Sequence, residues 1–150
     1  MGSVEAIFLR PAARLAVRSV DRAEAIAECG LEGDHAGGGK RQVTVLSLES
    51  WQDACAEFGR PLDPAVRRAN VVVAGVDLAQ SIGRTLRLGA ATVEILGETR
   101  PCELMDDDGR LGLDAALRKD RRGGVFGAIL SSGTVQVGDD VAILARPDAD

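Results

Sequence analysis

Short apolar segments rich in valine, leucine and isoleucine recur along this chain, and turns containing glycine or proline separate them. Short segments with many β-branched residues are typical of strands, whereas a helix needs a longer stretch with apolar residues at every third or fourth position. The pattern predicts about nine strands and two helices. Many short strands with few helices predict a mainly β fold that closes, or nearly closes, into a barrel.

Local signals predict particular elements within this fold. Apolar residues recur at helical spacing between Ser47, a typical N-cap residue, and Gly59, a typical helix stop, and a shorter helix is expected over residues 113–119. Tight-turn sequences predict two hairpins, over residues 85–96 and residues 134–144. We expect the helices to pack on the outside of the barrel.

The length and composition indicate one compact domain, which we expect to span residues 1–150. Hydrophobic residues make up 45% of the chain, but only three Phe, one Trp and no Tyr are present. The core must therefore consist of aliphatic side chains, and a binding platform of stacked aromatic rings is not expected.

The charge balance argues against two classes of partner. Lys and Arg number 18 and Asp and Glu 23, which gives a formal net charge of −5. A negative protein repels nucleic acid and anionic lipids unless its basic residues gather on one face. No apolar run approaches the ~20 residues that cross a bilayer, and residues 1–10 lack the layout of a signal peptide. We therefore expect a cytoplasmic protein with no nucleic-acid or membrane partner.

Three cysteines, at positions 29, 55 and 102, are widely spaced and form no CxxC pair, which argues against a disulfide framework and a zinc site. Cys102 follows Arg100 and Pro101 directly after a predicted strand, so we expect its thiol at the rim of the barrel. A thiol there can reach a ligand, and a nearby cation favours the reactive thiolate. The alternative is a small buried side chain. We assign Cys29 and Cys55 structural roles.

Three basic loops adjoin predicted strand ends, at residues 33–41, 67–70 and 118–124. The first carries the only histidine and three consecutive glycines, which leave backbone N–H groups accessible to an anion. The others offer guanidinium donors suited to a phosphate or a polar ring edge. Each loop alone is more typical of a solvated surface than of a binding site. Together, in an acidic protein, they predict convergence on one anionic ligand.

Five segments in order resemble the MOSC family, named after the C-terminal domain of molybdenum-cofactor sulfurases. They are residues 30–35 (GLEGDH), 67–75 (RRANVVVAG), 97–102 (GETRPC), 122–130 (RGGVFGAIL) and 133–139 (GTVQVGD). The resemblance covers most of the chain, in a form that stands alone. It implies a mixed β-barrel.

The resemblance also implies a ligand and a set of site residues. In relatives, a cysteine binds the molybdenum of the pterin cofactor or carries sulfur destined for it, and Cys102 matches that cysteine. Arg68 and Asn70 match contacts to the pterin or its phosphate. The further candidates for the pocket are Asp34, His35, Arg41 and Arg122.

Our leading hypothesis is a protein that binds molybdenum cofactor, acting in its delivery or in reduction of N-oxygenated substrates. Whether it is an enzyme stays open, because reduction would need a separate reductase protein and sulfur transfer a separate desulfurase. No pyridoxal-phosphate domain is present in this sequence, so that cofactor is not expected. Two alternatives are a persulfide carrier that uses no cofactor and a non-catalytic interaction barrel.

Overall fold

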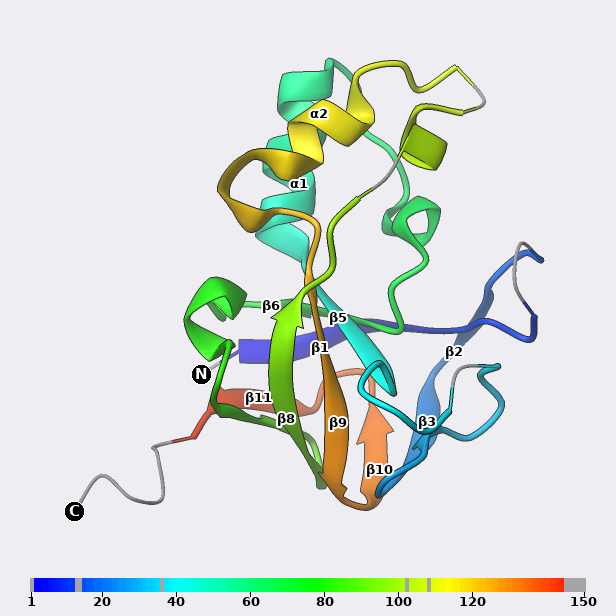
Figure 1. Ribbon diagram of the computed structural model, residues 1–150, viewed down its shortest axis with the longest axis vertical. Helices are drawn as coiled ribbons and strands as arrows, with labels where there is room; N and C mark the ends of the chain where they lie inside the picture. The colour runs from blue at the N-terminus through cyan, green and yellow to red at the C-terminus, as the bar shows by residue number, and fades with distance from the viewer. Residues whose placement is uncertain (1, 13–14, 36, 102, 108, 145–150) are drawn as a thin grey trace.

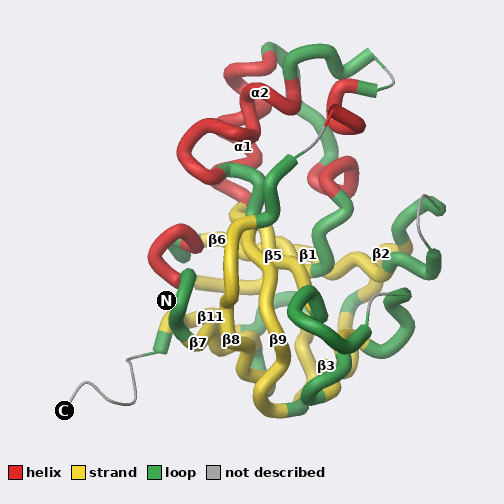
Figure 2. Tube along the Cα trace, in the orientation of Figure 1, coloured by secondary structure: helices red, strands yellow, loops and turns green. Residues whose placement is uncertain are grey.

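The computed structural model describes residues 2–12, 15–35, 37–101, 103–107 and 109–144. Figures 1 and 2 show the strands gathered at one end of the molecule and the helices at the other. The strands are β1 (Gly2–Leu9), β2 (Arg18–Val20), β3 (Arg22–Ile26), β4 (Gly30–Leu31), β5 (Val43–Ser47), β6 (Val71–Ala74), β7 (Thr85–Leu88), β8 (Ala91–Glu98), β9 (Val125–Ser131), β10 (Gly133–Gln136) and β11 (Asp140–Ile143). The helices are α1 (Leu48–Phe58) and α2 (Leu113–Arg118), with short 3₁₀ helices η1 (Pro64–Arg67), η2 (Leu78–Ser81), η3 (Glu103–Asp106) and η4 (Lys119–Arg121).

Seven of these strands form a closed barrel in the order β11-β7-β8-β9-β5-β6-β1. The ring closes where β1 returns to β11, with Gly2 opposite Val141 and Ser3 opposite Asp140. β5 and β6 run parallel, and the other barrel neighbours are antiparallel. The predicted mixed β-barrel with two short helices is therefore confirmed. β2 pairs with the far end of β1, and β10, β3 and β4 form a second small sheet.

One predicted hairpin is confirmed and the other is wrong. β7 and β8 pair antiparallel across their turn, with Leu88 opposite Ala91. The chain also turns at Gly138, whose φ is 96°. The strands on either side of that turn do not pair, because β10 pairs with β3 while β11 pairs with β7 and β1. Local turn chemistry indicates where a chain reverses, but the partner of each arm depends on distant strands.

Apolar side chains fill two spaces, and β5 and β6 contribute to both. Successive side chains of a strand point to opposite faces. Val45 and Val71 accordingly belong to the buried cluster inside the barrel, while Leu46 and Val72 belong to a cluster under the helices that includes Trp51. The helical layer is thus fixed to one side of these two strands, and the boundary between the layers lies beside them.

The predicted caps of α1 are present. The Ser47 hydroxyl accepts a hydrogen bond from the backbone N–H of Ser50 at 3.2 Å, and Gly59 ends the helix in the left-handed conformation. The second predicted helix, α2, ends one residue earlier than expected and packs against α1. In the described part of the chain, no helix is long and apolar enough to span a membrane.

Candidate functional site

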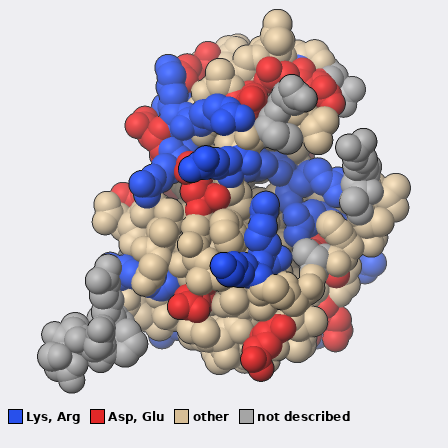
Figure 3. Space-filling view, viewed as in Figure 1, with Lys and Arg blue, Asp and Glu red and all other residues tan. Residues whose placement is uncertain are grey.

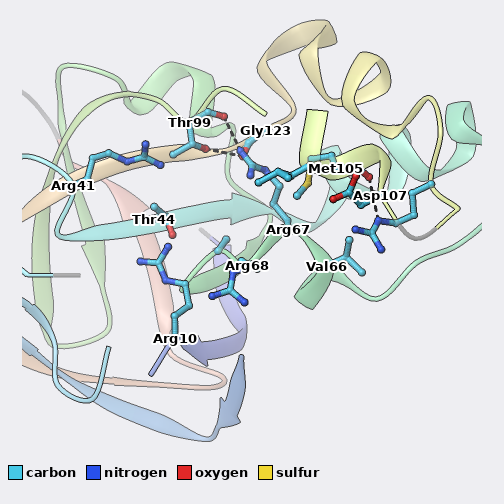
Figure 4. Close-up of a pocket in the computed structure, with 13 residues that line it drawn as sticks. Arg10, Arg41, Thr44, Val66, Arg67, Arg68, Thr99, Met105, Asp107 and Gly123 are labelled. Atoms are coloured by element: carbon cyan, nitrogen blue, oxygen red, sulfur yellow. Dashed lines mark hydrogen bonds between the residues drawn. The ribbon is translucent and has the colours of Figure 1, made fainter. Parts of the chain in front are cut away.

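A cavity of about 430 Å³ lies where the barrel meets the helical layer. Its walls come from the end of β1, the start of β5, η1, the exit of β8, the η3 region and the turn before β9. The lining residues are Arg10, Arg41, Thr44, Val66, Arg67, Arg68, Ala69, Thr99, Leu104, Met105, Asp107, Arg110 and Gly123, drawn in Figure 4. Only the folded chain brings these distant segments together.

The lining of this cavity carries mostly basic side chains. Five lining residues are arginines, and Asp107 is the one carboxylate among them. Figure 3 shows Lys and Arg side chains crossing the middle of this face, although the whole chain carries a formal net charge of −5. A cleft lined by one sign of charge concentrates ligands of the opposite sign. The volume lies within the range of roughly 300–1,000 Å³ that small-molecule pockets occupy.

Arg67 holds two walls of the cavity together. Its Nε donates to the carbonyl of Gly123 at 3.0 Å, and its Nη2 donates to the carbonyl of Thr99 at 3.0 Å. The Thr99 hydroxyl also donates to the Gly123 carbonyl, at 2.7 Å. A Cβ atom on Gly123 would lie 2.4 Å from the Thr99 carbonyl oxygen, so only glycine permits this close approach. The wall therefore fixes the position of the Arg67 charge.

Arg68, predicted to contact a ligand, lies on the cavity wall. It follows η1 in the left-handed conformation with φ 63°, which is uncommon for a residue other than glycine. Its guanidinium donates to the carbonyls of Leu15 and Ala12. Arg68 thus ties the loop after β1 to the wall, and its contact with a ligand stays a prediction.

Arg10 and Arg41 retain donors that a ligand can use. The Arg41 guanidinium lies 5.4 Å from the centroid of the Phe126 ring, and it makes no hydrogen bond or ion pair with any described residue. Arg10 is held on one side by Asp34, while its Nη1 donates to no residue of the described ranges. Figure 4 shows the two guanidinium groups on either side of Thr44. Paired guanidinium donors suit an oxyanion.

The structure places three other predicted site residues outside the cavity lining. The side chains of Asp34 and Asn70 are buried behind the wall, each with a relative exposure of 0%. His35 is exposed, and its backbone N–H donates to the carbonyl of Arg10 at 2.7 Å. All three therefore lie next to Arg10 or bond to it, and direct contact between any of them and a ligand stays a prediction.

Arg122, also predicted for the pocket, lies among the helices instead. Its Nη1 donates to the Glu57 carboxylate and to the carbonyl of Ala116, both at 3.1 Å. Lys119, with a further contribution from Arg122, lowers the pKa of Glu57. Arg122 lines a separate cavity of about 50 Å³ that also contains Ser47, the N-cap of α1. The structure therefore does not bring Arg122 to the arginine-lined cavity.

Cys102, the predicted reactive thiol, lies outside the described residues. Cys29 is exposed and Cys55 is buried. Burial raises the pKa of the Cys55 thiol, although a hydrogen bond with the backbone of Leu62 opposes the shift. Among residues with a described placement, no three His, Cys, Asp or Glu side chains gather as a metal site.

Sequence reasoning missed two cavity arginines, Arg10 and Arg110. Arg10 precedes Pro11, a pair that is typical of a turn, and Arg110 comes directly after residues 106–109 (DDDG), a pattern that is typical of a solvated loop. Arg10 does lie at a strand exit, as the predicted basic loops do. This position at the end of a strand could have indicated a cavity residue. A single arginine at a strand end is, however, too common in proteins to identify a binding site.

Comparisons with known proteins agree with this architecture. The family model of the MOSC domain matches residues 32–142. The YuaD protein of Bacillus subtilis has a similar solved structure, with TM-score 0.76, 20% identity and coverage of 94% of each chain. YiiM of Geobacillus stearothermophilus gives TM-score 0.77 at 15% identity, covering 99% of this chain and 78% of that one. YiiM of Escherichia coli gives TM-score 0.70 at 18% identity, covering 96% of this chain and 70% of that one. These likenesses establish the fold. No curated protein matches the sequence.

Proposed function

The chain belongs to the MOSC domain family, and we propose that it binds molybdenum cofactor in the arginine-lined cavity. We propose further that it delivers the cofactor or uses it to reduce an N-oxygenated substrate, with a separate reductase protein. The observation that carries the proposal is the gathering of five arginines around one cavity in an acidic protein. A family associated with this cofactor supplies the identity of the ligand.

The residues of the cavity fit the chemistry of the cofactor. Its phosphate needs strong hydrogen-bond donors, and Arg10 and Arg41 have guanidinium N–H groups available for it. Leu104 and Met105 provide an apolar part of the lining, which suits the flat face of a pterin. Arg67 fixes the relative position of the cavity walls by donating hydrogen bonds to the carbonyls of Gly123 and Thr99. We assign Arg68 to the wall next to the ligand.

We assign the metal-binding or sulfur-carrying role to Cys102. Its support is the sequence, in which Cys102 falls between Thr99 and Leu104, and both of these residues line the cavity. A soft metal centre favours a thiolate ligand. When bound, the cofactor supplies redox chemistry that amino-acid side chains lack. Such a thiol needs a reducing compartment, which is consistent with the expected cytoplasmic location.

The experiment that tests the proposal measures molybdenum and pterin in protein purified from a host that synthesises the cofactor. We expect both in the native chain, loss of molybdenum in Cys102→Ser, and native content in Cys29→Ser, which removes an exposed thiol outside the cavity lining. A native chain that binds neither, even when free cofactor is supplied, contradicts the proposal. A mass increase of one sulfur atom on that protein would support the persulfide carrier instead.

A further inference from the structure

The guanidinium of Arg10 is fixed from behind by a buried carboxylate. Its Nε donates to Asp34 Oδ1 at 3.1 Å and its Nη2 to Oδ2 at 3.0 Å, so two parallel bonds define its plane. The backbone N–H of Arg10 donates to the same Oδ1 at 2.7 Å. The side chain of Asp34 has a relative exposure of 0% and that of Arg10 14%. Arg10 therefore reaches the cavity with only a small part of its surface.

Asn70 supports this pair from a second direction. Its Nδ2 donates to Asp34 Oδ1 at 3.0 Å and to the carbonyl of Phe8 at 3.1 Å. Its Oδ1 accepts from Arg10 Nη2 at 3.3 Å and from the backbone N–H of Thr44 at 3.1 Å. Both amide hydrogens and the amide oxygen are thus occupied. A buried amide with this set of partners has no donor left for a ligand.

Only Nη1 of Arg10 is left without a described partner, and Arg10 lines the cavity. We infer that Asp34 and Asn70 are positioning residues that aim Arg10 at the anionic group of the ligand, and that Arg10 makes the contact. This inference rests on the proposed function, because it assumes that the cavity binds an anion. In this arrangement Asp34 and Asn70 do not touch the ligand themselves, and they affect its binding through Arg10.

The inference predicts a sign opposite to that of simple electrostatics. A carboxylate beside an anion site repels the anion, so charge alone predicts tighter binding when Asp34 is neutralised. If Asp34 instead positions Arg10, Asp34→Asn should weaken phosphate binding. The substitution replaces one carboxylate oxygen, an acceptor, with an amide donor, so the guanidinium of Arg10 is no longer held in one plane. Loss of one charge-assisted hydrogen bond corresponds to a dissociation constant that is roughly tenfold to hundredfold higher.

The test is a double-mutant cycle with inorganic phosphate as the probe, titrated calorimetrically into the full chain. The four proteins are the native chain, Arg10→Met, Asp34→Asn and the double variant, with Asp53→Asn on the exposed face of α1 as the matched control. We expect Asp34→Asn to weaken phosphate binding about tenfold when Arg10 is present and not to weaken it in the Arg10→Met background. The control should bind as the native chain does.

Two results overturn the inference while leaving the proposed function intact. In the first, the native chain binds phosphate and Asp34→Asn binds it more tightly. In the second, Asp34→Asn weakens phosphate binding equally in the native and the Arg10→Met backgrounds. A native chain that binds no phosphate contradicts anion binding itself, and this outcome is distinct from the other two.

Arg10→Lys keeps the test decisive if Asp34→Asn does not fold. The lysine retains the charge and a partner for Asp34, but an ammonium group cannot form two parallel bonds to a carboxylate. We expect weaker phosphate binding by a folded protein. Unchanged phosphate affinity in Arg10→Lys would show that the orientation of the guanidinium is irrelevant. The Nε–H resonance of Arg10 gives an independent measure, because it should exchange slowly in the native chain and rapidly in Asp34→Asn.

Discussion

Gly123→Ala should damage the cavity wall more than its single added methyl group suggests. The new Cβ would lie 2.4 Å from the backbone oxygen of Thr99 and 3.3 Å from Arg67 Nη2. Backbone cannot rotate away, so the two segments must separate. Their separation breaks or stretches the bonds by which Arg67 and the Thr99 hydroxyl hold them.

The expected loss of stability follows from these contacts. Overpacking costs ~1–3 kcal/mol, and a weakened hydrogen bond from a charged donor costs ~1.5–3 kcal/mol. Together they predict a free energy of unfolding lower by about 3–5 kcal/mol and a melting temperature lower by roughly 10 °C for a domain of this size. Urea denaturation and calorimetry measure the two quantities.

Gly37→Ala is the matched control for this substitution. Its Cβ would lie 3.7 Å from the nearest atom, the carbonyl oxygen of Cys29, which is an ordinary contact distance. The change should therefore leave stability within about 1 kcal/mol of native. If Gly123→Ala is no less stable than Gly37→Ala, the close approach of the two wall segments has no energetic significance and the reasoning fails.

Three further predictions concern the helical layer and the thiols. Ser47→Ala removes the acceptor for the Ser50 N–H and should lower the free energy of unfolding by ~1 kcal/mol, whereas an unchanged urea midpoint would argue against the cap. Iodoacetamide should alkylate Cys29 before Cys55, because burial raises the pKa of the Cys55 thiol and shields it, and equal rates by mass spectrometry would contradict this. Basic neighbours lower the pKa of Glu57, so its ionised form stabilises the fold at neutral pH and this contribution disappears as the pH falls through the lowered pKa. Glu57→Gln should therefore be less stable than the native chain at neutral pH and equal to it in acid, and a difference that persists in acid would refute the assignment.

Local signals allowed a large part of the fold to be predicted. Ser47 and Gly59 delimit α1 because capping depends on residues within one turn of the helix. The β7–β8 hairpin was predictable for the same reason, since its two strands are joined by the turn itself. The partner of β10 was not, because Thr134 lies opposite Glu24 in a strand far away in the sequence. The barrel order depends on such distant pairs.

The candidate site was predicted in its chemistry more than in its geometry. Arg41 and Arg68, from two of the three basic loops, do line one cavity, but the loop at residues 118–124 contributes only Gly123 to the lining. Asp34 and Asn70 share the polar character of ligand contacts, but the structure bonds them to Arg10, to each other and to the backbone. Sequence alone does not distinguish a residue that touches a ligand from one that holds such a residue, because both need the same functional groups.

If the arginine-lined cavity holds the cofactor, removing its positive charge must lower the amount of cofactor that the protein carries. The measurement is bound molybdenum and pterin in the native chain, in Arg10→Met/Arg41→Met, and in Arg87→Met, which removes an exposed arginine of β7 outside the cavity lining. We expect the native chain and Arg87→Met to carry equal amounts of cofactor and the double variant, although folded, to carry almost none. Equal cofactor content in all three proteins would show that the cofactor is not held by this cavity.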